Sequence, residues 1–354
     1  MTEIRALTGI RGIAALWVLF LHFGSELSVL ITQVDKLKPI FSKGHVGVDL
    51  FFILSGFIIT SVYSSVENWE AEKVKSFIRK RFARVYPVHL FTLLILAGLV
   101  LLSKLMGKSI SGDYSVQEFW YNVFMLQGFP ISAASWNYPS WSVSAEFFGY
   151  LVIFPLTVTV FNFPGMRKYA LLFSVLLIAG HQLLVINKVF GEWSAIARIT
   201  FEFIAGGALF HGLRGRSSVS AICSRSLIVV FLIGLGLCYL PNHIMGEQYV
   251  RALLVLLCLI VIAGLSTDEG GVCKFMGKPV LKYLGLISYS LYMTHAIVEK
   301  VFKTLLPVSS YSDSSFSIRV LIFGVYVITP LVVAAVTYHL VEERSRKFIL
   351  YKKL

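Results

Sequence analysis

Long apolar runs recur along the whole chain, and short polar stretches separate them. A helix needs about 20 mostly apolar residues to cross the hydrocarbon core of a bilayer. We place ten such spans, so the sequence predicts an all-α polytopic membrane protein. The predicted spans lie near residues 7–24, 45–63, 86–105, 142–162, 168–187, 193–212, 226–241, 249–266, 283–306 and 318–341.

The composition excludes an ordinary soluble domain. Of the 354 residues, 56% are hydrophobic and 14% are charged, and the mean hydropathy is +0.77. A soluble domain would carry about a quarter charged residues. The formal net charge is +13, from 32 basic and 19 acidic residues. In a soluble protein this excess would suggest nucleic acid, but basic loops between membrane spans explain it better. We therefore expect the lipid bilayer as a partner, and no nucleic acid.

The basic residues gather in alternate loops, which gives a predicted orientation. Lys and Arg are concentrated after spans two, four, six and eight and in the C-terminal tail, and the opposite loops are poorer in them. With ten spans, these five segments lie on one side, so the positive-inside rule places both termini in the cytoplasm. The segment 116–129 is too short and too mixed in polarity to cross. Its aromatic residues indicate a short interfacial or re-entrant helix.

The cysteines give no sign of a metal site. None forms a C-x-x-C pair, and no His/Cys cluster has the spacing of zinc ligands. We expect free thiols and no bound metal; the cysteines are Cys223, Cys238, Cys258 and Cys273. No small-residue cleavage site follows the first apolar run, so we expect an uncleaved first span and not a signal peptide.

Ionisable residues inside membrane spans are costly and mark either functional sites or ion pairs. The first span carries Arg11 and His22, eleven residues apart. This separation is about 16 Å along a helix axis at ~1.5 Å per residue, and eleven steps of about 100° return to nearly the same face. One stripe of the first helix is therefore predicted to carry Arg11 in its cytoplasmic half and His22 in its outer half.

Counting depth in the other spans predicts two layers of ionisable residues. The outer layer consists of His22, Asp49, Glu146 and His295. Polar residues on the stripes of Glu146 and His295 are Ser142, Ser288 and Tyr292. The inner layer is cationic and consists of Arg11, Arg79, Arg81 and Arg84.

The two layers suit the two halves of one reaction. A neutral imidazole that a carboxylate orients can take a proton from a hydroxyl group, and clustered guanidinium groups bind phosphates. We therefore expect His22 to act as a general base, with Asp49 accepting a hydrogen bond from its other ring nitrogen. The inner layer would bind a phosphorylated donor that enters from the cytoplasm.

Simpler interpretations of these residues remain open. The segment RKRFARVYP, residues 79–87, can act as a topological signal alone. Asp49 or Glu146 can instead pair with a basic residue near the outer side. The two candidates for that pairing are Arg251 and Arg319.

Other ionisable residues are expected to be structural. Arg198 and Glu202, at positions i and i+4 of span six, fit an ion pair better than a site. A lone histidine in a span is often a packing residue with its hydrogen bonds satisfied. This interpretation applies to His181, His211 and His339.

Five segments, in order, resemble motifs of the acyltransferase 3 family, integral membrane O-acyltransferases that modify bacterial cell-surface glycans. Span one matches its R-x10-H pattern, and GVDLFFILSGF resembles its second-helix motif. RKRFARVYP, WSVSAEFFGY and GLISYSLYMTH resemble its motifs at spans three, four and nine. The matching residues are Arg11, His22, Asp49, Arg79, Arg84, Pro87, Trp141, Ser142, Ser144, Glu146, Ser288, Tyr289, Tyr292 and His295. Phe147 departs from the pattern, since many members have a second acidic residue there.

The resemblance implies one transmembrane acyltransferase domain over residues 1–354, without the fused periplasmic domain of some relatives. It implies an acyl-CoA co-substrate, most often acetyl-CoA, and no tightly bound cofactor. The implied acceptor is a carbohydrate hydroxyl of a cell-surface or lipid-linked glycan, and the implied location is the bacterial inner membrane. Residues implied to line the site are Trp141, Ser142, Ser288, Tyr289 and Tyr292.

The sequence does not identify the glycan, the acyl chain or the oligomeric state. It also does not distinguish direct transfer from transfer through an acyl-enzyme. An alternative from another class is a secondary transporter of a lipid-linked sugar or an organic anion. Such transporters often show inverted repeats and pairs of helices broken by Gly or Pro. The sequence shows neither feature.

Overall fold

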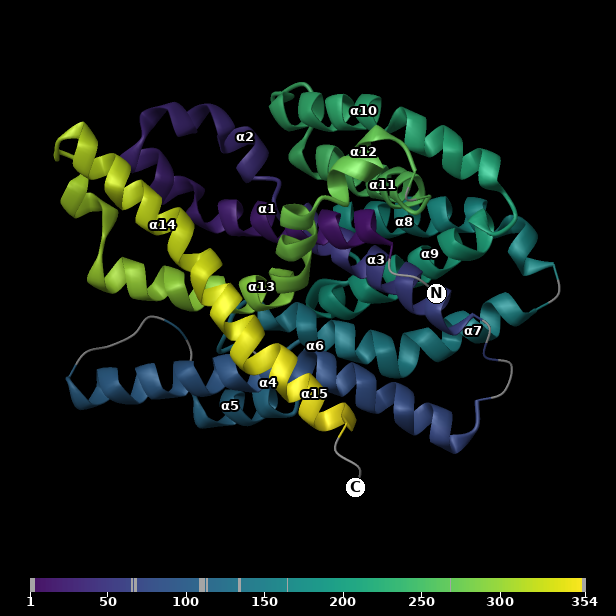
Figure 1. The fold of residues 1–354 in the computed structure, drawn as a ribbon, viewed down its shortest axis with the longest axis horizontal. Coiled ribbons are helices and arrows are strands. Elements are labelled where there is room, and N and C mark those ends of the chain that lie inside the picture. The colour runs from purple at the N-terminus through teal and green to yellow at the C-terminus, as the bar shows by residue number, and fades with distance from the viewer. Residues whose placement is uncertain are drawn as a thin grey trace. The chain divides into compact units, whose positions relative to one another are not determined.

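The computed structural model describes residues 4–351, apart from 65, 67–68, 108–111, 113, 133–134, 164 and 268. Within these residues the chain is helical and has no strand, which confirms the all-α prediction. Figure 1 shows the helices in chain order by colour. The chain divides into two compact units whose segments interleave along the sequence.

Nine helical segments of the described chain are long and apolar enough to cross a membrane. Each coincides with a predicted span, so the protein is a multi-pass membrane protein. Five segments are single helices: α1 (Arg5–Leu30), α3 (Val46–Tyr63), α4 (Ala71–Leu105), α10 (Ser217–Tyr239) and α11 (Glu247–Leu265). Two begin with short 3-10 turns and continue as α8 (Ala170–Ile186) and α9 (Ser194–Leu213). The last two contain π-helical turns: α6 (Ser140–Phe148) leads through Gly149–Ile153 to α7 (Phe154–Asn162), and α14 (Phe316–Thr337) leads through Tyr338–Glu342 to α15 (Glu343–Tyr351).

The remaining predicted span, 283–306, is a helix of lower hydropathy. It forms α13 (Pro279–Leu305), whose 27 residues are enough to cross a bilayer. The middle of α13 carries serines, tyrosines and a histidine, and this helix is not among the nine apolar segments of the described chain. The prediction of ten spans is thus confirmed for nine of them. The orientation depends on the number of spans and stays a prediction.

The predicted short helix at 116–129 forms over a narrower range, as α5 (Val116–Val123). Ser115 caps it, since its hydroxyl accepts a hydrogen bond from the Glu118 backbone N–H. Eight residues reach only about 12 Å, too little to cross a bilayer. Glu118 and Asn122 are buried, whereas Trp120 and Phe124 are exposed. This arrangement of a buried polar face and an exposed aromatic face suits an interfacial helix.

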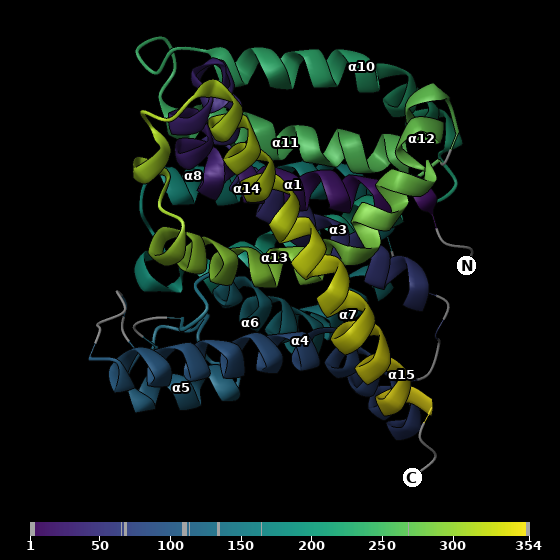
Figure 2. The same cartoon turned by 60° about the vertical axis from the view of Figure 1, so that its left-hand side comes forward.

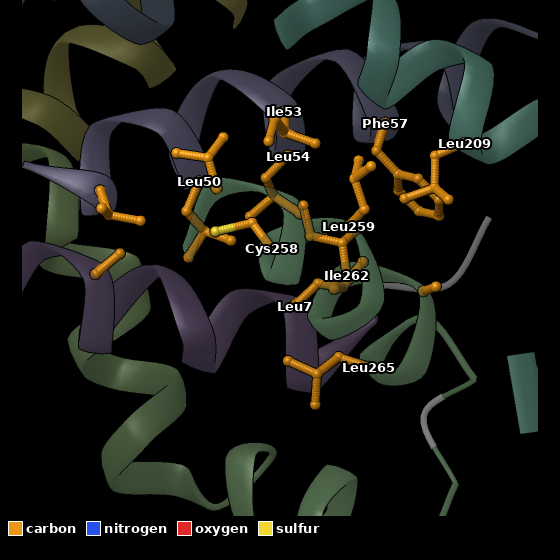
Figure 3. Close-up of a cluster of buried hydrophobic side chains, with 14 of the residues drawn as sticks. Leu7, Leu50, Ile53, Leu54, Phe57, Leu209, Cys258, Leu259, Ile262 and Leu265 are labelled. Atoms are coloured by element: carbon orange, nitrogen blue, oxygen red, sulfur yellow. The ribbon is translucent and has the colours of Figure 1, made fainter. Parts of the chain in front are cut away.

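Unit 1 consists of Met1–Leu21, Leu37–Asn68 and Gly149–Ser288. Apolar residues on α3 recur at i, i+3, i+4 and i+7, which places them on one stripe of the helix. Figure 3 shows this stripe packed against side chains of α11, with Leu7 from α1 and Leu209 from α9 in the same cluster. The stripe consists of Leu50, Ile53, Leu54 and Phe57, and the α11 side chains are Cys258, Leu259, Ile262 and Leu265.

Two glycines bring helices of unit 1 into backbone contact. A Cβ atom added at Gly206 on α9 would lie 1.9 Å from the Ile53 carbonyl oxygen on α3. A Cβ added at Gly285 on α13 would lie 1.9 Å from the Thr8 carbonyl oxygen on α1. Such approach requires glycine, because any side chain would overlap the facing backbone.

Unit 2 consists of His22–Lys36, Trp69–Phe148 and Tyr289–Leu354. Its longest element, α4, has 35 residues and extends about 52 Å. Figure 2 shows α5 and α15 near α4. Side chains in the middle of α4 contact the backbone of α5, and a side chain in the first turns of α4 contacts the backbone of α15. Helices α1 and α13 each contribute residues to both units.

Candidate active site

The last part of α1, the loop before α6 and the middle of α13 bring three rings together in unit 2. The His22 ring centroid lies 4.8 Å from that of Tyr138 and 5.3 Å from that of His295. His295 is 1% exposed, whereas His22 is half-buried. The structure therefore brings together the two histidines that depth counting placed in one layer. His22 is the one that a substrate can more easily reach.

The hydrogen bonds of His295 indicate which ring nitrogen carries its proton. Nδ1 lies 2.6 Å from the Tyr292 carbonyl oxygen, which can only accept, so Nδ1 donates. A second proton would place a cation in a buried setting, and the described hydrogen-bond partners of His295 include no carboxylate, so that charge would be costly. Nε2 is therefore an acceptor, and the Tyr138 hydroxyl donates to it across 3.1 Å. Burial raises the pKa of Tyr138, so the phenol keeps its proton.

A second set of hydrogen bonds fixes the loop that carries Tyr138. The hydroxyls of Ser142 and Tyr292 lie 2.7 Å apart, and both contact the Pro139 carbonyl oxygen, at 2.9 and 3.1 Å. The Asn137 side-chain amide donates to the Met293 carbonyl oxygen at 2.8 Å. These bonds hold residues 137–142 against α13. Ser142 and Tyr292, predicted to line the site, thus support the loop beside His295.

The other motif residues of α6 differ in their surroundings. The Ser144 hydroxyl donates to the Met125 carbonyl oxygen at 2.5 Å and accepts from the Gly128 N–H at 3.1 Å. It therefore ties α6 to the chain that follows α5. Trp141 and Glu146 are half-buried, and the predicted roles of both stay predictions.

Charged residues lie one helical turn beyond His22 on α1. Glu26 forms an ion pair with Lys303 of α13 at 3.3 Å, and Lys303 also pairs with Glu299 at 2.5 Å. The carboxylate one turn beyond His22 is thus paired with an ammonium group.

Arg84 from the predicted cationic layer belongs to a buried ion pair. Its Nη1 contacts Glu342 Oε1, and the Glu342 side chain is only 1% exposed. The other Glu342 oxygen accepts a hydrogen bond from the Ser290 hydroxyl at 2.7 Å. The Arg84 guanidinium also lies 5.7 Å from the centre of the Tyr289 ring, whose hydroxyl donates to the Val85 carbonyl oxygen at 2.6 Å. Tyr289, predicted to line the site, therefore packs against Arg84.

The other arginines of that layer have different settings. Arg79 is exposed, and its Nη2 lies 3.4 Å from the Leu350 carbonyl oxygen of α15. Arg81 is half-buried, with its guanidinium 5.8 Å from the centre of the Phe77 ring. Arg11 lies half-buried in unit 1. Donor binding by these arginines stays a prediction.

Asp49 belongs to a buried ionic cluster in unit 1. Arg198 contacts both carboxylate oxygens, through Nε at 2.7 Å and Nη2 at 2.6 Å, and Arg251 Nη2 lies 3.3 Å from Oδ1. The Asp49 side chain is fully buried. The alternative of a pairing with Arg251 is therefore present in the structure. The hydrogen bond from His22 that we expected would reach a carboxylate already engaged by two guanidinium groups.

The predicted pair of Arg198 and Glu202 belongs to the same cluster but is not its tightest contact. Arg198 Nε lies 3.6 Å from Glu202 Oε1, farther than from Asp49. His181 Nδ1 lies 3.7 Å from the same Glu202 oxygen, and both side chains are fully buried. The four residues that join Asp49 in this cluster are Arg198, Glu202, Arg251 and His181.

The remaining predicted residues are structural or peripheral. Ser288 is buried in unit 1 and donates to the Gly285 carbonyl oxygen at 2.8 Å. His211 stacks on Phe161 with ring centroids 4.9 Å apart, as a packing residue would, but its buried Nδ1 has no hydrogen-bond partner among the described residues. His339 is exposed, so its predicted packing role is wrong. All four cysteines are free thiols. Among the described residues, no group of three or more His, Cys, Asp or Glu side chains is placed to hold a metal ion.

Sequence reasoning missed Tyr138 and Glu342. Tyr138 lies in a loop, where no helical periodicity assigns a depth or a face. Glu342 directly precedes the acidic and basic residues of the tail, so it resembled a surface charge. A carboxylate that immediately follows a long apolar run was the one available signal for it.

Comparisons with known proteins identify the family of this chain. A family model described as an acyltransferase domain matches residues 4–339. The acyltransferase MdmB of Streptomyces mycarofaciens is 35% identical over 163 residues, which cover 44% of this chain and 39% of the relative. The O-acetyltransferase OatA of Staphylococcus aureus is 24% identical over 367 residues, which cover 96% of this chain and 57% of the relative.

The chain thus spans less than three fifths of the length of these curated relatives. No solved structure gives a significant match. The family match covers nearly the whole chain and includes every motif that the sequence singled out. The chain belongs to the acyltransferase domain family, the acyltransferase 3 family whose motifs it resembles.

Proposed function

We propose that the protein moves an acyl group, most often acetyl, from acyl-CoA to a hydroxyl of a cell-surface or lipid-linked glycan in the bacterial inner membrane. The observation that carries the proposal is the accessible imidazole of His22 beside the buried pair of His295 and Tyr138. The names of the relatives, an acyltransferase and an O-acetyltransferase, support the same reaction class.

His22 is the general base in this proposal. As the acceptor hydroxyl oxygen attacks the thioester carbonyl carbon, its proton passes to a ring nitrogen of His22. The tetrahedral intermediate then collapses, the carbon–sulfur bond breaks, and the CoA sulfur takes the proton back from the imidazolium. The products are the glycan ester and free CoA, and His22 returns to its neutral form.

His295 and Tyr138 support this step without taking the proton themselves. Both nitrogens of His295 already have partners, Tyr292 and Tyr138, so the ring is fixed and neutral. A neutral neighbour 5.3 Å away opposes the charging of His22 less than a cation would. In this proposal Asp49 holds α3, α9 and α11 together and does not orient His22, because two guanidinium groups engage its carboxylate.

The donor would enter from the cytoplasm, with its phosphates bound by the arginines of α4. Guanidinium groups suit phosphates because they donate paired, charge-assisted hydrogen bonds. The thioester at the end of the long pantetheine arm would then reach His22. One protein can in this way join a cytoplasmic donor to an outward-facing acceptor.

The experiment uses the purified protein in detergent with acetyl-CoA labelled in the acetyl group. We expect the label to be transferred or the thioester to be hydrolysed, and mass spectrometry of surface glycan should show acetyl esters that depend on this protein. An intact thioester, together with identical glycans in cells with and without the protein, would contradict the proposal. That outcome would favour the transporter alternative.

A further inference from the structure

Glu342 is a buried carboxylate that the proposed reaction does not yet use. It is the last residue of the π-helical turn Tyr338–Glu342, between α14 and α15. Such turns are rare, and they frequently occur at functional sites. The Glu342 side chain is 1% exposed, and a buried carboxylate is costly unless charges or hydrogen bonds satisfy it.

Two partners on different helices satisfy Glu342. Ser290 of α13 donates to one carboxylate oxygen at 2.7 Å, and Arg84 of α4 contacts the other. Because each oxygen has its own partner, the carboxylate cannot rotate without losing one of them. The position of Glu342 is therefore fixed by α13, and Glu342 in turn fixes the guanidinium of Arg84.

The guanidinium of Arg84 is also held from a second direction. The Tyr289 ring lies beside it, and the Tyr289 hydroxyl is bound to the backbone of α4 one residue beyond Arg84. Glu342 contacts Nη1, one of the two terminal nitrogens of the guanidinium. The Arg84 side chain is 19% exposed and that of Glu342 is 1% exposed, so Arg84 is the member of the pair that a donor can reach. A cation fixed in advance binds an anion with less loss of side-chain entropy.

We propose that Glu342 is a positioning residue that, together with Ser290, orients Arg84 toward the nucleotide phosphates of the acyl-CoA donor. This inference rests on the proposed function, because it needs a phosphorylated donor at α4. Glu342 does not touch the reacting atoms. The negative charge of Glu342 also lowers the net charge around Arg84. Arg84 therefore contributes through the orientation of its guanidinium, and Arg79 and Arg81 supply the excess positive charge.

A purely structural ion pair would make a different prediction. Loss of a structural pair would weaken the binding of every donor equally, since the whole fold would loosen. Loss of a positioning residue would weaken the binding only of donors that carry the phosphates. S-acetylpantetheine provides this distinction, because it has the thioester and the arm of acetyl-CoA but none of its nucleotide phosphates.

The experiment measures the dissociation constants of acetyl-CoA and S-acetylpantetheine for the full-length protein in detergent. The variants are Glu342→Gln, Ser290→Ala and Arg84→Ala, and the matched control is Glu343→Gln, which removes the neighbouring half-buried carboxylate. We expect Glu342→Gln to raise the dissociation constant of acetyl-CoA about tenfold and to change that of S-acetylpantetheine less than about twofold. Ser290→Ala should give a smaller rise for acetyl-CoA alone, and it carries the test if Glu342→Gln does not fold.

Three results would overturn the positioning role. One is an equal loss for both donors, and another is unchanged acetyl-CoA binding in both Glu342→Gln and Ser290→Ala. The third is tighter acetyl-CoA binding in Glu342→Gln, which would mean that the carboxylate competes with the phosphates. Wild-type protein that binds neither donor would instead overturn the proposed function, and the positioning role with it.

Discussion

Two buried polar regions of this protein use ionisable side chains in opposite ways. In unit 1, the cluster around Asp49 contains two carboxylates and two guanidinium groups, and each charge has an opposite charge within 3.6 Å. In unit 2, the rings of His22, His295 and Tyr138 meet through neutral contacts, and His22 stays partly exposed. One region uses up its charges in ion pairs, and the other leaves a base accessible.

The comparison shows that an ionisable residue inside a span is not by itself a sign of catalysis. Asp49 and His22 are both expensive to bury, and both lie in segments that match family motifs. The surroundings distinguish them, because the guanidinium groups of Arg198 and Arg251 both pair with the Asp49 carboxylate. We infer that the first region stabilises the fold and that the second performs the reaction.

The largest effect on stability is expected at Asp49. Asp49→Ala would leave two guanidinium groups facing one another without their shared carboxylate, which costs about 3–5 kcal/mol for a buried pair. We expect little folded protein, measured as the monodisperse fraction and the thermal midpoint in detergent. The double variant Asp49→Leu with Arg198→Met should recover part of the loss, because it removes both charges.

A measurement of activity can contradict this division of roles between the two regions. If Asp49→Asn is as stable as wild type but loses acetyl transfer, Asp49 belongs to the reaction and the division of roles between the regions is wrong. In that case the hydrogen bond from His22 to Asp49, predicted from depth alone, would again be the better account.

A smaller effect is expected at Tyr138. Tyr138→Phe keeps the ring beside His22 but removes the hydroxyl that donates to His295. We expect acetyl transfer to fall about tenfold, close to the value of one hydrogen bond, while the thermal midpoint changes little. The matched control is Tyr311→Phe, at a tyrosine in a short turn between α13 and α14. Equal activity of Tyr138→Phe and wild type would remove the pair of His295 and Tyr138 from the reaction.

Sequence patterns predicted the parts of the fold that depend on one helix at a time. Apolar runs located nine spans, because the length and hydropathy of a segment decide whether it can cross a bilayer. Depth counting predicted that His22 and His295 share a layer, and their rings lie 5.3 Å apart. Depth depends only on the rise per residue, so it can be read from a sequence.

Which helices face each other could not be read in the same way. Asp49 was assigned the correct kind of partner only as an alternative, because depth does not say which neighbour a side chain faces. Arg84 matched a motif, but its partner Glu342 lies 258 positions away in the chain. Tyr138 lies in a loop without periodicity. These contacts come from tertiary packing, for which a single sequence carries no local signal.

In the proposed reaction, His22 is the base and the donor phosphates bind elsewhere. The most direct measurement is the transfer of labelled acetyl from acetyl-CoA to glycan by His22→Ala, alongside the CoA dissociation constant of the same variant. His339→Ala serves as the control, because His339 is an exposed histidine in the same unit. We predict that transfer falls about 10²–10⁴-fold in His22→Ala, as for loss of a general base, while CoA affinity stays within about twofold. Transfer at the wild-type rate in His22→Ala would contradict this account.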